Sequence, residues 1–257
     1  QGRLLGRASA IGFDLQLPER VRVMTDEAVR TAAIEGGALE ADSVRSSVAR
    51  RLGLDATMKA IPREIDGLVE VLVDATTGFD RPLTLERILG WHAAIFPTGW
   101  SGMHRVSAGA FRGPGMPMQV VSGPVGHESV HYVAPPGEAV DAEMSRFLEW
   151  FNAAGSSVDG LILAAIAHLR FVTIHPFEDG NGRIARVITE MALARDQGGP
   201  ERWFSMSAAV MADRDGYYQA LRAASTGTAD ITGWILWFLD SMGTAVASAM
   251  VQIDAAV

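Results

Sequence analysis

Residues 175–186 read HPFEDGNGRIAR, and this stretch lies between two segments with the pattern of core helices. Upstream, residues 161–169 read LILAAIAHL, an apolar run that predicts a helix buried on most of its surface. Downstream, apolar residues recur at helical spacing from Ile184 to Ala192. The stretch is therefore a short loop, punctuated by one proline and two glycines, that ends one core helix and begins the next.

The loop carries groups that suit a chain of phosphates. Gly180 and Gly182 let the backbone approach a ligand closely. Amides at the start of the following helix have no partner within it and favour negative charge. Arg183 and Arg186 are three residues apart, on one face of the first turn, where two guanidinium groups can grip phosphate oxygens. The pattern indicates an anion site.

Two further side chains add chemistry to this anion site. Asp179 supplies a hard oxygen ligand suited to Mg²⁺ that bridges phosphates. His175 titrates near neutral pH and can take a proton from an attacking hydroxyl. A helical corner with a solvated arginine pair is the simpler interpretation of a lone Gly-rich loop. Because the other polar residues also have roles in phosphate transfer, a nucleotide-dependent transferase is favoured.

Every specified position of the motif H-P-F-x-[D/E]-G-N-G-R-x-x-R is matched by residues 175–186, and at these residues the chain resembles the Fic family. The resemblance implies transfer of AMP from ATP to a Ser, Thr or Tyr hydroxyl of a protein target, which can be the chain itself. It implies that His175 is the base and that Asp179 is the Mg²⁺ ligand. Asn181, with the Gly180 and Gly182 backbone, would form the anion hole around the α- and β-phosphates. Arg183 would contact the β-phosphate, and Arg186 the γ-phosphate.

The composition excludes several other classes of protein. Of 257 residues, 48% are hydrophobic and 20% charged, and helix formers dominate, which predicts a mostly helical fold with a sizeable core. The net charge of −8 argues against nucleic acid as the main partner. The chain has no cysteine, which suits a reducing cytoplasm. We expect a cytoplasmic protein without a membrane partner, because no uncharged run of membrane-spanning length and no signal-peptide pattern is found.

A second feature lies near the N-terminus. Residues 25–36 read TDEAVRTAAIEG and predict a helix that begins at Thr25, after an irregular lead-in or short helix over residues 1–24. Glu35 would then face the negative end of the helix dipole, so its carboxylate should seek a cation elsewhere. A surface glutamate without a partner is the alternative.

Residues 31–36 read TAAIEG and also fit [S/T]-x-x-x-E-[G/N], an inhibitory motif found before many Fic domains. The resemblance implies that Glu35 pairs with Arg186, displaces the γ-phosphate and leaves ATP misaligned for transfer. Glu35 could instead orient a water for the removal of AMP.

Glycine and proline are dense from residue 102 to 136, where residues 118–121 and 129–133 predict a β-hairpin. This segment resembles the Fic flap, and an exposed strand edge there could hold a target by backbone pairing. Residues 127–131, HESVH, also satisfy the zinc-protease motif H-E-x-x-H, with Glu149 as a third ligand. That chemistry needs a sustained helix, which the surrounding glycines and prolines oppose, so a metalloprotease is a remote alternative.

The remaining segments predict helices. Amphipathic patterns cover residues 39–53, 62–75, 84–96 and 140–151, and a helix carrying Tyr217 matches the family's R-x-x-Y-Y-x-x-L. Tyr217 either lines the adenine pocket or packs in the core. We expect His92 and His168 to be core histidines bonded to backbone. The apolar terminal helix around Trp234 belongs to the core or forms a contact in a homodimer.

The sequence thus predicts an all-α Fic fold, a helical bundle with one β-hairpin flap. Residues 1–80 are expected to form an N-terminal helical segment with the inhibitory helix, at about residues 25–36, and residues 81–257 the Fic domain with C-terminal helices. The expected activity is that of a protein adenylyltransferase. Transfer of UMP, phosphocholine or phosphate, removal of AMP, and a non-enzymatic scaffold are the alternatives.

Overall fold

Helices make up most of the computed structural model, which describes residues 13–54, 60–115, 118–122, 129–154, 158–226 and 229–256. The elements in chain order are α2 (Phe13–Ile34), α3 (Ala41–Arg51), α4 (Arg63–Thr77), α5 (Leu85–Ile95), β1 (Trp100–Ser101), β2 (His104–Arg105), β3 (Gln119–Ser122), β4 (Ser129–Val133), the 3₁₀ turn η1 (Gly137–Ala139), α6 (Val140–Ala153), α7 (Gly160–Ile174), α8 (Asn181–Gln197), α9 (Met206–Ala212), α10 (Arg214–Thr226) and α11 (Thr232–Ala256). The prediction of a helical fold with a β-hairpin is confirmed.

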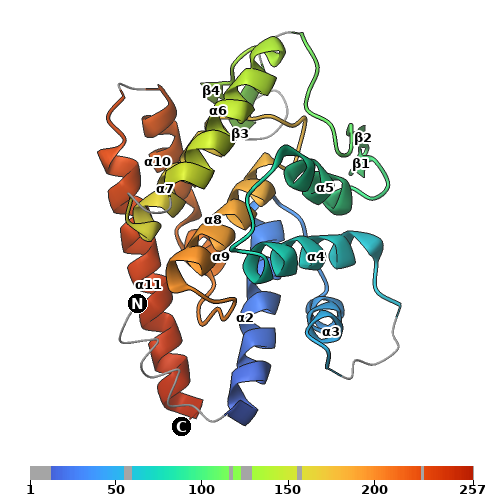
Figure 1. Cartoon of the computed structure of the whole chain (residues 1–257), viewed down its shortest axis with the longest axis vertical. Helices are drawn as coiled ribbons and strands as arrows, with labels where there is room; N and C mark the ends of the chain where they lie inside the picture. Colours follow the sequence, from blue (N-terminus) through green and yellow to red (C-terminus); the bar gives the residue numbers. More distant parts are fainter. Residues whose placement is uncertain are drawn as a thin grey trace.

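Helices α7 and α8 pack against each other at the centre of the molecule (Figure 1). Helix α8 is buried on nearly all sides, as its unbroken set of buried residues from Ile184 to Ala194 shows. Helix α4 covers α8, while α6 and α11 cover α7. The loop between α7 and α8 is therefore held at the end of the most buried pair of helices in the fold.

Helix α2 is longer than the sequence analysis predicts, and its expected start is wrong. The helix already includes Phe13 and continues through Pro18 to Ile34, whereas residues 1–12 lie outside the described part of the chain. Thr25 does not cap a helix: its hydroxyl donates to the Val21 carbonyl at 2.7 Å, one turn back along the same helix. A threonine hydroxyl can make either bond, so its presence alone does not locate a helix start.

The segment after α8 forms two helices where the sequence analysis describes one. Ser205 caps α9, because its hydroxyl accepts the amide of Ala208 at 3.0 Å. The chain then breaks at Asp213, whose carboxylate accepts the amide of Gly216 at 3.2 Å and starts α10. Both residues are typical helix-capping types.

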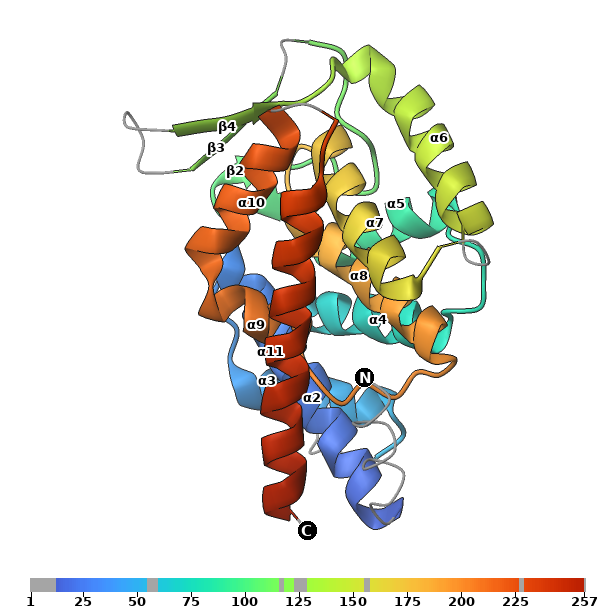
Figure 2. The ribbon, with the colours of Figure 1, turned by 90° about the vertical axis from the view of Figure 1, so that its left-hand side faces the viewer.

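Strands β3 and β4 pair antiparallel in the predicted flap, which projects from the body of the molecule (Figure 2). His131 lies in β4, while His127 and Glu128 are outside the described residues. The H-E-x-x-H stretch thus runs into a strand rather than along a helix. The strand is the observation that opposes the metalloprotease alternative, because H-E-x-x-H chemistry needs both histidines on one helix.

Two further features were not predicted. Strands β1 and β2 form a second, very short hairpin between α5 and the flap. Within α11, residues Thr232–Gln252 are long and apolar enough to cross a membrane by length and composition, and 33% of that stretch is buried in the structure. A core helix of a soluble protein can have the same composition, so this property alone assigns no location.

Candidate functional site

His175 ends helix α7 in an unusual backbone conformation. Its φ of 50° is in the left-handed region, which among the described residues no other non-glycine residue occupies. The His175 amide still donates to Phe171 at 3.0 Å, and its carbonyl accepts Nε of the buried Arg112 at 2.7 Å. A non-glycine residue persists in this region only when its surroundings hold it there. The turn out of α7 is thus fixed from both sides.

The ring of His175 is oriented by its own helix. Nδ1 lies 3.2 Å from the Val172 carbonyl, and because a carbonyl only accepts, Nδ1 carries the proton of the neutral ring. The lone pair is then on Nε2. Burial lowers the pKa of His175 to about 4, with Arg112 acting in the same direction and Val172, Glu35 and Asp179 opposing it. At neutral pH the side chain is therefore an uncharged base, and the expected titration near neutral pH is wrong because the ring is buried.

The loop is stabilised internally by Asn181, the first residue of α8. Its side-chain oxygen accepts the Phe177 amide and its side-chain nitrogen donates to the Phe177 carbonyl, both at 2.9 Å. Phe177 is fully buried. Both polar ends of the Asn181 side chain are thus used to hold the shape of the loop.

His92 supports the same loop from α5. Its ring stacks on Phe177 with centroids 3.8 Å apart, and Nε2 donates to the Asp179 carbonyl at 3.1 Å. Nδ1 accepts the amide of Gly109 at 3.0 Å. Burial lowers the pKa of His92, which keeps the ring in the neutral form that both bonds require. The expected backbone bonding of His92 is confirmed.

Both glycines of the loop lie directly against other side chains. Gly180 has a φ of 82°, and a β-carbon there would lie 2.7 Å from the ring of Phe96. At Gly182 a β-carbon would lie 2.1 Å from Oε1 of Glu35. The second distance also locates the Glu35 carboxylate directly against the first turn of α8.

Asp179 is held by two hydrogen bonds at the edge of the loop. Oδ1 accepts the amide of Gly180 at 2.6 Å, and Oδ2 accepts the hydroxyl of Ser101 at 2.5 Å. Its side chain is 46% exposed, with the Arg183 guanidinium 3.7 Å away. A carboxylate has about four lone-pair sites, so these bonds leave capacity for a cation. The donor type, the exposure and the spare lone pairs fit Mg²⁺.

The two arginines have different surroundings. The Arg183 guanidinium lies 4.5 Å from the centroid of the Phe96 ring, and burial lowers its pKa. Arg186 is almost fully buried and is bonded to α2 instead: Nε donates to the Thr31 hydroxyl at 2.5 Å and NH2 to the Thr31 carbonyl at 3.0 Å. Nε of Arg183 and NH1 of Arg186 are buried without a hydrogen-bond partner among the described residues. Each arginine therefore retains a donor for an anion.

Glu35 forms the contact with Arg186 that the sequence analysis predicts. NH2 of Arg186 donates to Oε1 of Glu35 at 2.8 Å, and the Glu35 side chain is 37% exposed. Glu35 lies one residue beyond the end of α2, just before Gly36 with a φ of 80°. Thr31, whose hydroxyl also holds Arg186, was not assigned a role from sequence, although it is the first residue of the [S/T]-x-x-x-E-[G/N] motif.

Tyr217 lies in the core, which is one of the two positions that the sequence analysis leaves open. It is 2% exposed, and its hydroxyl lies 2.9 Å from Nε2 of His168. Nδ1 of His168 lies 3.0 Å from the Thr189 hydroxyl, so His168 is bonded to side chains and the expected backbone bonding is wrong. Tyr218 is half-buried, and its hydroxyl donates to the Ile34 carbonyl at 3.3 Å.

Parts of the chain match known families and proteins. Residues 82–193 match the sequence profile of the Fic/DOC family, and residues 1–54 match a domain of unknown function, DUF4172. The chain is 29% identical over 214 residues to a "Protein adenylyltransferase Fic" of Drosophila ananassae, covering 82% of this chain and 38% of that protein. A protein of the same name from Nematostella vectensis is 26% identical over 199 residues, covering 76% and 42%. The chain thus spans about two-fifths of the length of these curated relatives.

Solved structures show the same fold. A Fic-domain-containing signaling protein from Bacteroides thetaiotaomicron superposes with a TM-score of 0.72 at 18% identity, covering 98% of this chain and 94% of that one. Fic-1 of C. elegans, residues 134–508, gives a TM-score of 0.69 at 20% identity, covering 100% and 71%. The matched residues 82–193 contain the whole loop from His175 to Arg186, so this part of the chain is a Fic domain.

Proposed function

We propose that the protein transfers AMP from ATP to a Ser, Thr or Tyr hydroxyl of a protein target. The observation that carries this proposal is the neutral His175 base, with its lone pair on Nε2, on the same loop as two arginines that have unpartnered buried donors. The names of the relatives from Drosophila and Nematostella support the choice of AMP and ATP. In this proposal residues 81–257 are the catalytic part, and residues up to 80 are regulatory.

The chain's residues would act on the hydroxyl and on the triphosphate at once. Nε2 of His175 takes the hydroxyl proton as the hydroxyl oxygen forms a bond to the α-phosphorus. The bond from the α-phosphorus to the oxygen bridging to the β-phosphate breaks, and pyrophosphate leaves with that electron pair. The amides that open α8 and the Arg183 guanidinium stabilise the negative charge on the phosphates. His175 then releases its proton to solvent.

Asp179 would hold Mg²⁺ in this site. The ion would supply positive charge that neutralises the phosphate oxygens. The carboxylate is already oriented by Ser101 and by the Gly180 amide, so it need not reorganise on binding. Its partial exposure also leaves room for the waters that Mg²⁺ usually retains.

Glu35 would inhibit this reaction by occupying the anion site. Its carboxylate lies against Gly182 and takes one guanidinium nitrogen of Arg186, the residue assigned to the γ-phosphate by the resemblance. A phosphate and a carboxylate cannot share that position, because both are negative and the space next to Gly182 is already filled. ATP would then bind with its triphosphate displaced from the alignment that transfer needs.

The test compares the parent chain with Glu35→Gly and with Glu35→Gly/His175→Ala. Each is incubated with Mg²⁺, ATP labelled at the α-phosphate and a mixture of candidate proteins, and products are identified by mass. We expect labelled AMP on protein with Glu35→Gly, at least about tenfold less with the parent, and a loss of about 10²–10⁴-fold when the base is removed. Equal labelling by parent and Glu35→Gly would refute self-inhibition.

The same experiment separates the alternatives. Parallel reactions with UTP, CDP-choline and ATP labelled at the γ-phosphate report transfer of other groups by the mass of the adduct. Loss of AMP from a pre-modified protein, dependent on Glu35, would indicate removal instead of transfer. If no variant modifies protein with any donor, the proposed activity is wrong and the fold serves as a scaffold.

A further inference from the structure

The hairpin formed by β1 and β2 has two different faces. Trp100 pairs with Arg105, and Ser101 pairs with His104. Cross-strand partners share a face of a hairpin, whereas successive residues point to opposite faces. Trp100 and Arg105 therefore lie on one face, and Ser101 and His104 on the other.

The inner face fixes the hairpin to the loop of the proposed site. The Ser101 hydroxyl donates to Oδ2 of Asp179 at 2.5 Å. Just after β2, the amide of Ser107 donates to Oε2 of Glu178 at 2.9 Å, and its hydroxyl lies 3.3 Å from Oε1. The hairpin is thus a neighbour of Asp179 by direct contact, and whatever binds to it lies beside the reacting groups.

The outer face exposes apolar surface. Trp100 is 46% exposed and Met103, in the turn, is 89% exposed. They are two of the six large apolar side chains that are exposed in the described part of the chain, and they are only three residues apart. Single exposed apolar residues are common, but a tryptophan next to an exposed methionine is typical of contact surfaces.

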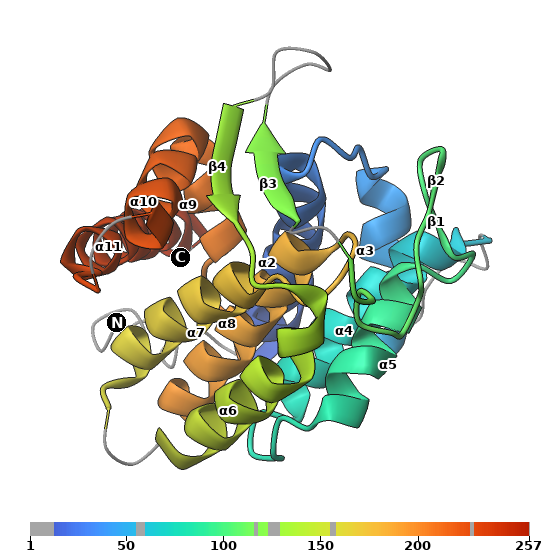
Figure 3. The same cartoon turned by 90° about the horizontal axis from the view of Figure 1, so that it is seen from above.

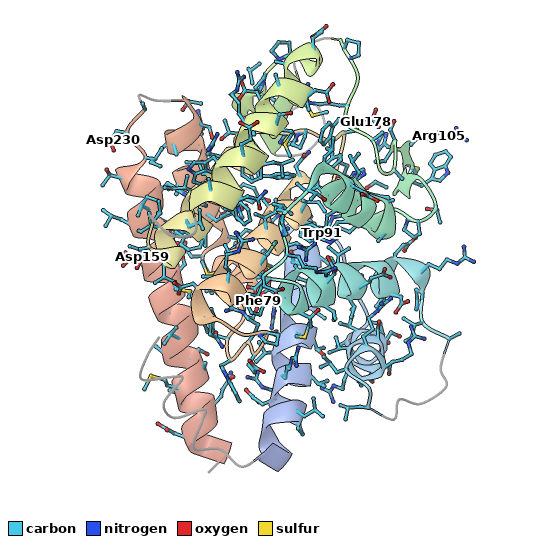
Figure 4. The ribbon with its side chains drawn as sticks, in the orientation of Figure 1. Phe79, Trp91, Arg105, Asp159, Glu178 and Asp230 are labelled. Atoms are coloured by element: carbon cyan, nitrogen blue, oxygen red, sulfur yellow. The ribbon has the colours of Figure 1, made fainter. Side chains whose placement is uncertain are left out.

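The same face is basic. The Arg105 guanidinium lies 5.3 Å from the centroid of the Trp100 ring, and its side chain points away from the body of the molecule at the edge shown in Figure 4. Arg105 is in none of the ion pairs found among the described residues, and the neighbouring Glu178 accepts hydrogen bonds from Ser107. On a chain with a net charge of −8, Arg105 gives the outer face of this hairpin a positive charge that attracts acidic groups.

We propose that the β1–β2 hairpin is a docking site for the protein substrate, and that it binds an acidic segment containing an apolar residue near the modified hydroxyl. The inference rests on the proposed transfer to protein. The start of α8 lies between this hairpin and the flap (Figure 3), so a segment that reaches the site can contact both. The charge of Arg105 selects the acidic side chain, and Trp100 with Met103 covers the apolar one.

Binding is measured first, without nucleotide, so that the result does not depend on the chemistry. The probes are fluorescent peptides with a central serine, one leucine and a run of Asp and Glu on either side of the serine, and a matched set with Lys. We expect the Glu35→Gly chain to bind the acidic peptides more tightly than the Lys peptides. Adding Arg105→Glu should lower the affinity for the acidic peptides by about fivefold to tenfold. Arg222→Glu is the control, because it makes the same charge change on the exposed part of α10, on the opposite side of the molecule in Figures 1 and 3.

The transfer of labelled AMP to the same peptides is then measured with each variant. A higher KM for acidic peptides with Arg105→Glu, an unchanged kcat and a gain for the Lys peptides would support docking at the hairpin. Trp100→Ala should lower the binding of all peptides that carry leucine. If the Glu35→Gly chain binds the peptides equally well with and without Arg105→Glu or Trp100→Ala, the inference is overturned, whatever the activity. Selective binding without transfer would instead leave docking in place and reject the proposed chemistry.

Discussion

The loop from His175 to Arg186 and the end of α2 meet at one arginine, yet the two regions are held in different ways. The loop is bonded from inside by buried groups: Asn181 holds both polar atoms of the Phe177 backbone, and Arg112 holds the carbonyl of His175. The end of α2 holds Arg186 through the buried Thr31 and through Glu35, which is 37% exposed and lies beyond the last helical residue. Segments with exposed contacts open at a lower free energy than buried ones.

This difference matches the separate roles proposed for the catalytic loop and for the inhibitory contact. A base and an anion site must keep their geometry through each turnover, because a small misplacement costs much of the rate. An inhibitory contact has to be released, so it belongs on an element that can move without unfolding the core. Loss of loop contacts should therefore abolish activity, while loss of α2 contacts should increase it.

Among changes to the contacts that hold these two regions, the largest effect is expected from Asn181→Ala in the Glu35→Gly chain. The change leaves a buried amide and a buried carbonyl of Phe177 unsatisfied, which costs about 2–4 kcal/mol of stability in or near the loop. We expect AMP transfer to fall about 100-fold, since the loop loses its shape. Transfer is measured with labelled ATP and stability by urea denaturation.

Asn152→Ala provides the matched control for that variant. Asn152 makes the same pair of hydrogen bonds, both at 2.9 Å, to the backbone of Leu83, away from the loop. It should change transfer by less than about twofold. If both variants lose activity equally, the effect is a general loss of stability and the loop has no special rigidity.

A second prediction concerns the stability of the buried core around His168 at acid pH. Burial lowers the pKa of His168 to about 3, whereas the unfolded chain protonates near 6.5. Below pH 6.5 the unfolded state therefore binds a proton at His168 that the folded state does not bind. As the pH falls, this residue alone reduces the free energy of unfolding by about 1.4 kcal/mol per pH unit. His175, with a pKa of about 4, acts in the same direction. Urea denaturation at pH 7 and pH 5 measures the loss.

His168→Gln should reduce that slope, since glutamine can bond to Tyr217 and Thr189 without titrating. A slope that does not respond to His168→Gln would place the acid sensitivity elsewhere, and the core around α7 would then not be the acid-labile part of the fold.

Much of the site could be predicted because its signals are local. The loop has a dense motif, and the helices on either side have continuous apolar patterns. The pair between Glu35 and Arg186 joins residues 151 positions apart, and it was predicted only because each partner lies in its own motif. The aromatic motif around Tyr217 has the same pattern whether its ring packs in the core or on a ligand, so sequence could not decide between them.

The missed features have no such signal. Strands β1 and β2 contain two residues each, too few to show the alternation that identifies a strand. The bond from Ser101 to Asp179 spans 78 positions and joins residue types found on any surface. The start of α2 was misplaced because Thr25 can either cap a helix or bond back within one. Sequence therefore predicts elements and motifs better than the contacts that orient them.

A third prediction weakens the contact between α2 and Arg186 without removing Glu35. Thr31→Val keeps the shape of the side chain but loses the hydroxyl that accepts Nε of Arg186. A hydrogen bond to a charged group contributes about 1.5–3 kcal/mol, part of which the Thr31 carbonyl retains, so we expect transfer to rise about fivefold. Thr25→Val removes a hydroxyl from the same helix that bonds only within it, and should not raise transfer. A rise with both variants would indicate general loosening of α2.

The smallest effect is expected from Tyr218→Phe, which removes a hydrogen bond from α10 to the end of α2. The Tyr218 hydroxyl and Nε of Arg214 both donate to the Ile34 carbonyl, the last of α2, at 3.3 and 3.1 Å. Because Arg214 remains, loss of the longer bond should loosen the end of α2 by about 0.5 kcal/mol and raise transfer about twofold. Arg214→Gln combined with Tyr218→Phe should raise AMP transfer further, since the Ile34 carbonyl then loses both the Arg214 and the Tyr218 donor. If the double variant is no more active than the parent, α10 does not hold the inhibitory end, and Thr31 with Glu35 alone accounts for the attachment to Arg186.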